Sequence, residues 1–273
     1  MGEKGVETYQ LVAGIKNMDV DTAEQTVLDG QEQPPVLLAR KLMEEVEQKK
    51  VDARLLGGVA IYLRSPRVHI DPLARTYHDI DLAVSRRAKK ALTEIMTSQG
   101  FVGDRHFNAL HGHKRMVFQK DNVEVDIFIH LFEQCHNLDL EERITRDPLT
   151  LSLADLLLTK LQVVHINHKD LTDVLGLLLQ YPLGTGEEHD IIDLNVIRSV
   201  TSQDWGWYTT VSDNLQKLVD LAQPLLSQSE VDLVKERVNL LRQAMEEAPK
   251  SLAWKLRSKV GRRLPWYVVP DEK

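Results

Sequence analysis

The chain has little cysteine and no long apolar run, and each shortage excludes a class of protein. Its 273 residues include one cysteine, Cys135, which excludes an internal disulfide framework and a zinc site built from several cysteines. No stretch approaches the roughly 18 consecutive apolar residues of a membrane-spanning helix. The first ten residues lack the apolar region of a signal peptide. We therefore expect a soluble, cytoplasmic protein without a membrane partner.

Charge is unevenly spread along the chain. The net charge of -7 argues against a surface that coats nucleic acid, yet residues 249–263 contain six Lys and Arg and no acid. In the same stretch Leu252, Leu256 and Val260 recur every four residues, which predicts an amphipathic helix with these side chains packed inward. Its basic stripe fits either an ordinary charged helix face or phosphate contacts with a tRNA-like acceptor.

Hydrophobic periodicity predicts an α+β fold, with a mixed β-sheet flanked by helices and a helical region behind it. We predict a first domain in residues 1–182 and a helical domain in residues 183–273, joined by the Pro- and Gly-containing segment 181–189. The predicted elements are a helix at 36–50, a strand, tight turn and helix at 52–66, a strand at 77–84, a helix at 85–100, an antiparallel hairpin of 114–120 with 123–129, helices that begin near 151 and 170, and helices within 213–226, 229–248 and 249–263.

Two carboxylates lie where a buried strand should begin. In the stretch YHDIDLAV, Asp79 and Asp81 are two residues apart and therefore project from the same face of a strand. Side-by-side carboxylates repel unless a cation lies between them, and hard oxygen ligands suit Mg²⁺ or Mn²⁺. Taken alone, such a pair is more typical of solvated acids at a strand edge, and it is a weak signal of a metal site.

Two further features strengthen the metal hypothesis. Gly57 and Gly58 lie at a predicted strand-to-helix junction, where exposed amides can approach a phosphate, although a structural turn would also explain them. Downstream, VEVDIF places Asp126 in a predicted neighbouring strand. Three acids close together suit two-metal phosphoryl transfer, with Asp126 as the candidate general base.

The order of these motifs resembles the nucleotidyltransferase superfamily. The segments RLLGGVAIYL, YHDIDLAV, VEVDIF and LSLADLLLTKLQVVHINHKDLTDVLGLLL are similar to its DNA polymerase β-like fold, and in particular to the branch of AbiEii/AbiGii-type toxins, over about residues 50–180. A histidine before the DxD strand, here His78, also makes the chain similar to the aminoglycoside and lincosamide nucleotidyltransferases.

The resemblance implies a role for each matching residue. Asp79 and Asp81 would bind metal, Asp126 would fill the third acidic role in metal binding or catalysis, and Gly57 and Gly58 would hold the nucleotide phosphates. Lys160, in an apolar helix, would reach the triphosphate, and Asp173 in the K-D-x-x-D segment would lie at the nucleotide site. Asp170 of that segment is well placed to cap the following helix instead.

The expected activity is Mg²⁺-dependent (or Mn²⁺-dependent) transfer of a nucleoside monophosphate from an NTP to a hydroxyl. The acceptor stays open between tRNA, a protein and a small molecule, and an antitoxin partner is implied by the toxin branch. Two alternatives from other classes remain: a non-catalytic nucleotide-binding module of the same fold, and a DxD glycosyltransferase that holds a nucleotide sugar. Trp205, Trp207 and Tyr208 form an aromatic cluster that we expect to lie in an interdomain core rather than in a base-stacking platform.

Overall fold

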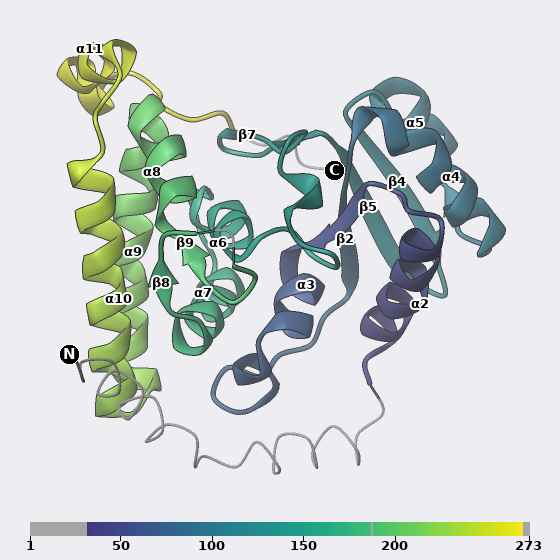
Figure 1. Ribbon diagram of the computed structural model, residues 1–273, viewed down its shortest axis with the longest axis horizontal. Coiled ribbons are helices and arrows are strands. Elements are labelled where there is room, and N and C mark those ends of the chain that lie inside the picture. The colour runs from purple at the N-terminus through teal and green to yellow at the C-terminus, as the bar shows by residue number, and fades with distance from the viewer. Residues whose placement is uncertain (1–31, 187, 270–273) are drawn as a thin grey trace, which may run out of the picture. The chain divides into compact units, whose positions relative to one another are not determined.

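The computed structural model describes residues 32–186 and 188–269, and from Pro34 onward these residues form one compact unit (Figure 1). The elements follow the predicted order of a mixed α/β part and then helices. Their bounds are α2 Pro34–Gln48, β1 Ala53–Leu56, α3 Gly57–Arg64, η1 Pro66–His69, β2 Asp79–Val84, η2 Arg86–Ala88, α4 Lys89–Ser98, β3 Val102–Gly103, α5 Arg105–His111, β4 Arg115–Lys120, β5 Val123–Ile129, β6 Leu131–Glu133, β7 Asn137–Asp139, η3 Ile144–Arg146, α6 Leu153–Leu161, α7 His168–Gln180, β8 Leu183–Gly184, β9 Ile192–Asp193, α8 Leu194–Gln203, α9 Trp205–Leu225, α10 Gln228–Glu247, α11 Leu252–Val260 and η4 Gly261–Arg263.

The main sheet has five strands in the order β1-β2-β5-β4-β3. Only β2 and β5 run parallel; the other neighbouring strands are antiparallel, which makes the sheet mixed, as predicted. The β4–β5 hairpin turns through Asp121 and Asn122, whose φ values are 50° and 62°. Two successive positive φ values are typical of a type I′ turn, whose twist matches the flanking strands. The predicted hairpin and its antiparallel pairing are confirmed.

Side-chain caps fix where two helices near the sheet begin. Ser152 accepts a hydrogen bond from the amide of Asp155 and so caps α6, as the sequence predicts. Helix α7 begins earlier than expected, because Asn167 accepts from the amide of Asp170. The expectation that Asp170 itself caps this helix is therefore wrong, and the Asp170 side chain is left available for another contact.

Helices α3, α6 and α7 lie between the sheet and the C-terminal helices (Figure 1). Their apolar side chains belong to one continuous hydrophobic core that also includes residues of the sheet and of α8, α9 and α10. Burial of this kind is the main favourable term in folding. The hydrophobic core includes residues from both sides of residue 182. The predicted division into two domains at this residue stays a prediction.

The aromatic cluster at the start of α9 is divided between core and surface. Trp207 is 4% exposed, and its Nε1 donates to the carbonyl of Asn137 at 3.2 Å. Trp205 and Tyr208 are half-buried. The expectation of a core position thus holds fully for Trp207 only.

The prediction for the last helix is right about helicity and wrong about direction. Helix α11 forms, but Leu252, Leu256 and Val260 are 74%, 56% and 36% exposed instead of packed inward. The side of α11 that faces the body carries Trp254 and Arg257. The Trp254 ring meets the Tyr208 ring of α9 edge-to-face, and the Arg257 guanidinium lies over the Trp205 ring of α9. Across residues 32–186 and 188–269, the structure contains no helix of the length and apolar character needed to cross a membrane.

Candidate active site

The parallel pairing of β2 with β5 places four acids side by side. Asp81 is the register partner of Asp126, and Asp79 is the partner of Glu124. Alternate residues of a strand share a face, so all four carboxylates project from the same side of the sheet. Asp126 is 5% exposed, Asp81 is half-buried, and Asp79 is exposed. The group thus extends from Asp126, which is buried, to Asp79, which solvent or a ligand can reach.

Asp81 carries the electrostatic cost of this grouping. Burial, together with the neighbouring charges of Asp79 and Asp126, raises the pKa of Asp81 to about 7, while Lys160 and Arg115 act in the opposite direction. Burial and like charges both disfavour the ionised form of a carboxyl group. Without a bound cation, Asp81 is therefore partly protonated near neutral pH.

Gly57 brings the start of α3 against Asp81. Its φ is +70°, and a Cβ at this position would lie 2.0 Å from Oδ2 of Asp81. Only glycine adopts this backbone without strain and leaves room for the carboxylate. Leu56, the residue before the helix, supplies no side-chain cap to the first amides of α3. Such amides, with the helix dipole, favour an anion.

A second close approach occurs at Gly58. A Cβ there would lie 2.3 Å from Nη2 of Arg75 and 2.9 Å from Cδ1 of Tyr77. The guanidinium of Arg75 stacks over the Tyr77 ring, with Cζ 3.9 Å from the ring centroid. The glycine pair thus admits a carboxylate on one side and a cation on the other.

Arg75 and Lys160 meet at one buried carboxylate. Asp173, which is fully buried, accepts from Nε and Nη2 of Arg75 at 2.9 and 2.7 Å and lies 3.0 Å from Nζ of Lys160. Lys160 also donates to Asp170 at 2.6 Å. Burial alone would lower the pKa of Lys160, but Asp173 and Asp170 more than offset this and hold the pKa above its ordinary value. Lys160 therefore stays charged.

Sequence reasoning missed Arg115. This residue lies on β4, and its Nε and Nη2 approach Oδ1 of Asp126 to 3.0 and 2.9 Å. The register of the hairpin contained the signal: Val117 pairs with Asp126, and Arg115, two residues away, projects from the same face. Glu124 is a fourth acid of the group, because its pairing with Asp79 places it on the same face.

The structure brings all the predicted site residues into one region. Gly57 lies against Asp81, and Gly58 lies against Arg75. Asp173 forms ion pairs with both Arg75 and Lys160. Asp126 is connected to Asp81 by the strand register. The catalytic, nucleotide-binding and metal-binding roles of these residues stay predictions.

The donor chemistry of the region fits a hard divalent cation in part. All four clustered donors are carboxylate oxygens, the ligands that Mg²⁺ and Mn²⁺ favour. Within residues 32–186 and 188–269, however, no three or more His, Cys, Asp or Glu side chains are placed so that they could hold a metal ion together. Mg²⁺ commonly uses one or two carboxylates, with substrate phosphates and water as its other ligands. The residues fit that open type of site.

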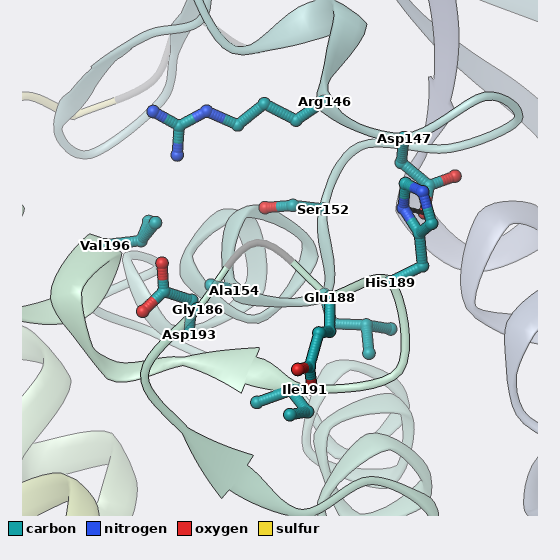
Figure 2. A pocket seen from close by; sticks show the side chains of 11 residues that line it. Arg146, Asp147, Ser152, Ala154, Gly186, Glu188, His189, Ile191, Asp193 and Val196 are labelled. Carbon is teal, nitrogen blue, oxygen red and sulfur yellow. Dashed lines mark ion pairs between the residues drawn. The ribbon is translucent and has the colours of Figure 1, made fainter.

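A hollow elsewhere on the molecule is too small to hold a nucleotide. Its lining includes Arg146, Asp147, Ser152, His189 and Asp193 (Figure 2), and it holds about 30 Å³, which is space for little more than one water molecule. His189 and Asp147 point toward one another in Figure 2, with Nδ1 and Oδ2 3.3 Å apart. Asp147 is also paired with Arg64. We interpret these contacts as interactions that stabilise the fold.

Comparisons with known proteins agree with the motif order. Residues 36–176 match the model of a family described as uncharacterised nucleotidyltransferase. Among solved structures, the chain is similar to a protein from H. pylori that is provisionally named a nucleotidyltransferase, with 14% identity, a TM-score of 0.37, and coverage of 81% of this chain and 100% of that one. This likeness is too distant to carry an inference about chemistry. No curated protein shows significant sequence similarity to the chain.

Proposed function

Because the chain belongs to the family of uncharacterised nucleotidyltransferases, we propose that it transfers a nucleoside monophosphate from an NTP to an acceptor hydroxyl. The observation that carries this proposal is the register of Asp81 beside Asp126, with Gly57 pressed against the Asp81 carboxylate. One face then offers carboxylates for a cation and helix amides for phosphates. These are the two needs of phosphoryl transfer, which depends on positioning and charge stabilisation.

Asp79 and Asp81 are the proposed ligands of Mg²⁺ or Mn²⁺. Asp79 is exposed and Asp81 is half-buried, so both can be reached from the same face. The chemistry that a divalent cation supplies when bound is neutralisation of phosphate charge and polarisation of the acceptor hydroxyl. The mutual repulsion that raises the pKa of Asp81 is what such a cation would relieve.

The amides of Gly57 and Gly58, with Arg75 and Lys160, are the proposed phosphate contacts. Asp173 is fully buried and already engaged by both cations. We therefore refine its predicted role: Asp173 acts at the nucleotide site by positioning Arg75 and Lys160 rather than by touching the nucleotide. A planar guanidinium held by a bidentate carboxylate is well oriented for a phosphate oxygen.

Asp126 is the proposed proton acceptor. Its carboxylate takes the proton of the acceptor hydroxyl as that oxygen forms a bond to the α-phosphorus. The bond from the α-phosphorus to its bridging oxygen breaks, and pyrophosphate leaves with the electron pair. Arg115 fixes the orientation of Asp126 through two nitrogen contacts near 3 Å.

The AbiEii/AbiGii-type branch stays part of this proposal on the strength of Lys160 followed by the K-D-x-x-D segment at Lys169, Asp170 and Asp173. RNA, protein and small-molecule acceptors all fit. NTP binding tests the proposal first: in Mg²⁺, an NTP should raise the melting temperature of the wild type, and Asp79→Ala should abolish this rise. Absence of any NTP effect in the wild type would overturn the proposal, and NTP binding without turnover on any acceptor would favour the non-catalytic alternative.

A further inference from the structure

Helix α11 presents a row of apolar side chains to solvent. Leu252, Leu256 and Val260 are 74%, 56% and 36% exposed and share one side of the helix, because residues four apart are neighbours on a helix surface. Six of the ten exposed large apolar residues in the described part of the chain lie in residues 252–269. Large exposed apolar groups gathered in one place mark interaction sites.

This outward direction is built into the local structure. The Ser251 side chain caps α11 by accepting from the amide of Trp254 at 3.1 Å, and its hydroxyl donates to the carbonyl of Gln203 at 3.0 Å. On the inner side, Arg257 lies 5.0 Å over the Trp205 ring and donates to the carbonyl of Gly261 at 2.6 Å. These contacts hold the helix in one orientation, at the upper left of Figure 1.

Cations flank the apolar row on one side. Lys255 and Lys259 are exposed and lie three residues after Leu252 and Leu256, so they are their neighbours on the helix surface. In the part of the chain that the structure describes, neither lysine forms an ion pair, and residues 249–269 contain no Asp or Glu. We name Leu252, Lys255, Leu256, Lys259 and Val260 the α11 face.

The charge of the α11 face limits which molecules can bind to it. A second copy of the α11 face would place lysines against lysines, which is unfavourable. An extended polyanion such as a bilayer or a nucleic-acid duplex would also approach the rest of the molecule, and outside residues 249–263 the sequence has 28 Lys and Arg against 41 Asp and Glu. Repulsion of this kind extends over a Debye length of about 8 Å at physiological salt. A partner that covers only the α11 face avoids this repulsion.

The shape of the α11 face limits the possible binding partners further. Three apolar side chains at four-residue spacing form a straight ridge about 12 Å long, given a rise of roughly 1.5 Å per residue. Such ridges pack into the grooves of another helix. We propose that the α11 face docks an acidic amphipathic helix of a partner protein, with apolar residues on the ridge and carboxylates opposite Lys255 and Lys259. This site is separate from the proposed nucleotide site and does not depend on it.

A synthetic peptide provides the probe. The full chain is titrated into a fluorescent helical peptide of about 20 residues, with leucines along one side and glutamates along one flank. A matched peptide carries lysines in place of the glutamates. Fluorescence anisotropy should show about tenfold tighter binding of the acidic peptide, a difference that shrinks at high salt. Leu256→Ser should weaken this binding about tenfold, and Lys259→Glu should shift the preference toward the lysine peptide.

Leu240→Ser on α10 is the matched control, because Leu240 is 39% exposed and lies outside the α11 face. It should leave peptide binding unchanged, and circular dichroism melts should show that all three variants fold. The proposal is overturned if the two peptides bind equally, or if Leu256→Ser and Leu240→Ser behave alike. It is also overturned if anionic vesicles or a single-stranded oligonucleotide bind through the α11 face while the acidic peptide does not.

Discussion

Asp81 lies directly beside Asp126 on the one pair of parallel strands in the five-stranded sheet, and Gly57 leaves its carboxylate just enough room. Parallel pairing of the two strands makes Asp81 and Asp126 direct neighbours although 45 positions separate them in the sequence. The geometry therefore concentrates negative charge at one point of the sheet. That concentration costs stability in the folded chain, and the proposed cation would relieve the cost.

The first prediction concerns Asp81→Asn and pH. The pKa of Asp81 rises from 3.8 to about 7 on folding, so the folded state binds the proton more tightly than the unfolded state. By linkage, this group lowers the free energy of unfolding as pH rises from about 4 to 7, with no further change above pH 7. In metal-free solution at pH 8, Asp81→Asn should be roughly 2–4 kcal/mol more stable than the wild type.

The gap between Asp81→Asn and wild type should narrow as the pH falls from 7 and close below the ordinary pKa of 3.8, because Asp81 is then protonated in both the folded and unfolded states. Urea unfolding at several pH values in EDTA measures it. Addition of Mg²⁺ should stabilise the wild type and leave Asp81→Asn unaffected. A difference in unfolding free energy that does not vary with pH would contradict the charge argument.

The second prediction separates backbone strain from steric contact at Gly57. Gly57 and Gly100 have φ values of +70° and +82°, but a Cβ at Gly100 has nothing within 4 Å. Gly100→Ala should cost about 1–2 kcal/mol, the usual penalty of a left-handed alanine. Gly57→Ala should cost more, because its Cβ meets Oδ2 of Asp81, and it should also abolish the NTP-induced rise in melting temperature. Equal losses of stability would show that contact with Asp81 is unimportant.

Much of this site follows from sequence, because strand periodicity places Asp79 and Asp81 on one face and the Asp121-Asn122 turn fixes the hairpin that carries Asp126. What the sequence could not supply is the partner of each charge. The contact of Arg75 with Asp173 joins residues 98 positions apart and depends on how α7 packs near η1. A pattern within either segment contains no trace of that packing.

The error at α11 has a different physical cause. A period of four in leucines predicts an apolar face, and the usual assumption is that such a face covers the core. In this helix the inner side is occupied by Trp254, which meets the Tyr208 ring edge-to-face, and by Arg257, which lies over the Trp205 ring. Periodicity identifies a face but not the side that another molecule or the core will cover.

The third prediction concerns Asp173. Its removal leaves Arg75 and Lys160 without their shared buried counterion, and breaking a buried pair costs roughly 3–5 kcal/mol. Asp173→Asn should therefore destabilise the chain strongly in urea unfolding. Asp190→Asn is the matched control: Asp190 is 85% exposed and 3.5 Å from Arg64, so its loss should cost less than about 1 kcal/mol. Similar losses for both would argue against a buried positioning role.

The fourth prediction tests Arg75 as a phosphate contact. Arg75→Gln should weaken NTP binding about tenfold while NMP binding changes little, since the proposed contact is with the outer phosphates. Arg67→Gln, which removes a guanidinium paired with Glu230, should leave both affinities unchanged. Calorimetric titration in Mg²⁺ measures the two affinities. Equal weakening of NTP and NMP binding would indicate a structural role for Arg75 alone.

The fifth prediction concerns Arg115 as a positioning residue for Asp126. Arg115→Gln should lower the transfer rate at saturating NTP with little effect on NTP affinity, because it disturbs the proton acceptor and not the phosphate contacts. Lys114→Gln is the neighbouring control, since Lys114 is 56% exposed and pairs with Glu133 instead. A change in NTP affinity without a change in turnover would contradict this assignment.

Transfer of label from an α-labelled NTP tests the central claim most directly. The purified chain is incubated with Mg²⁺, each of the four NTPs in turn, and an extract that supplies acceptors, and label is followed into RNA, protein and small-molecule fractions. Label should enter one fraction for the wild type and for Asp190→Asn, and none for Asp79→Ala. Label that persists undiminished in Asp79→Ala would contradict the proposed transfer activity.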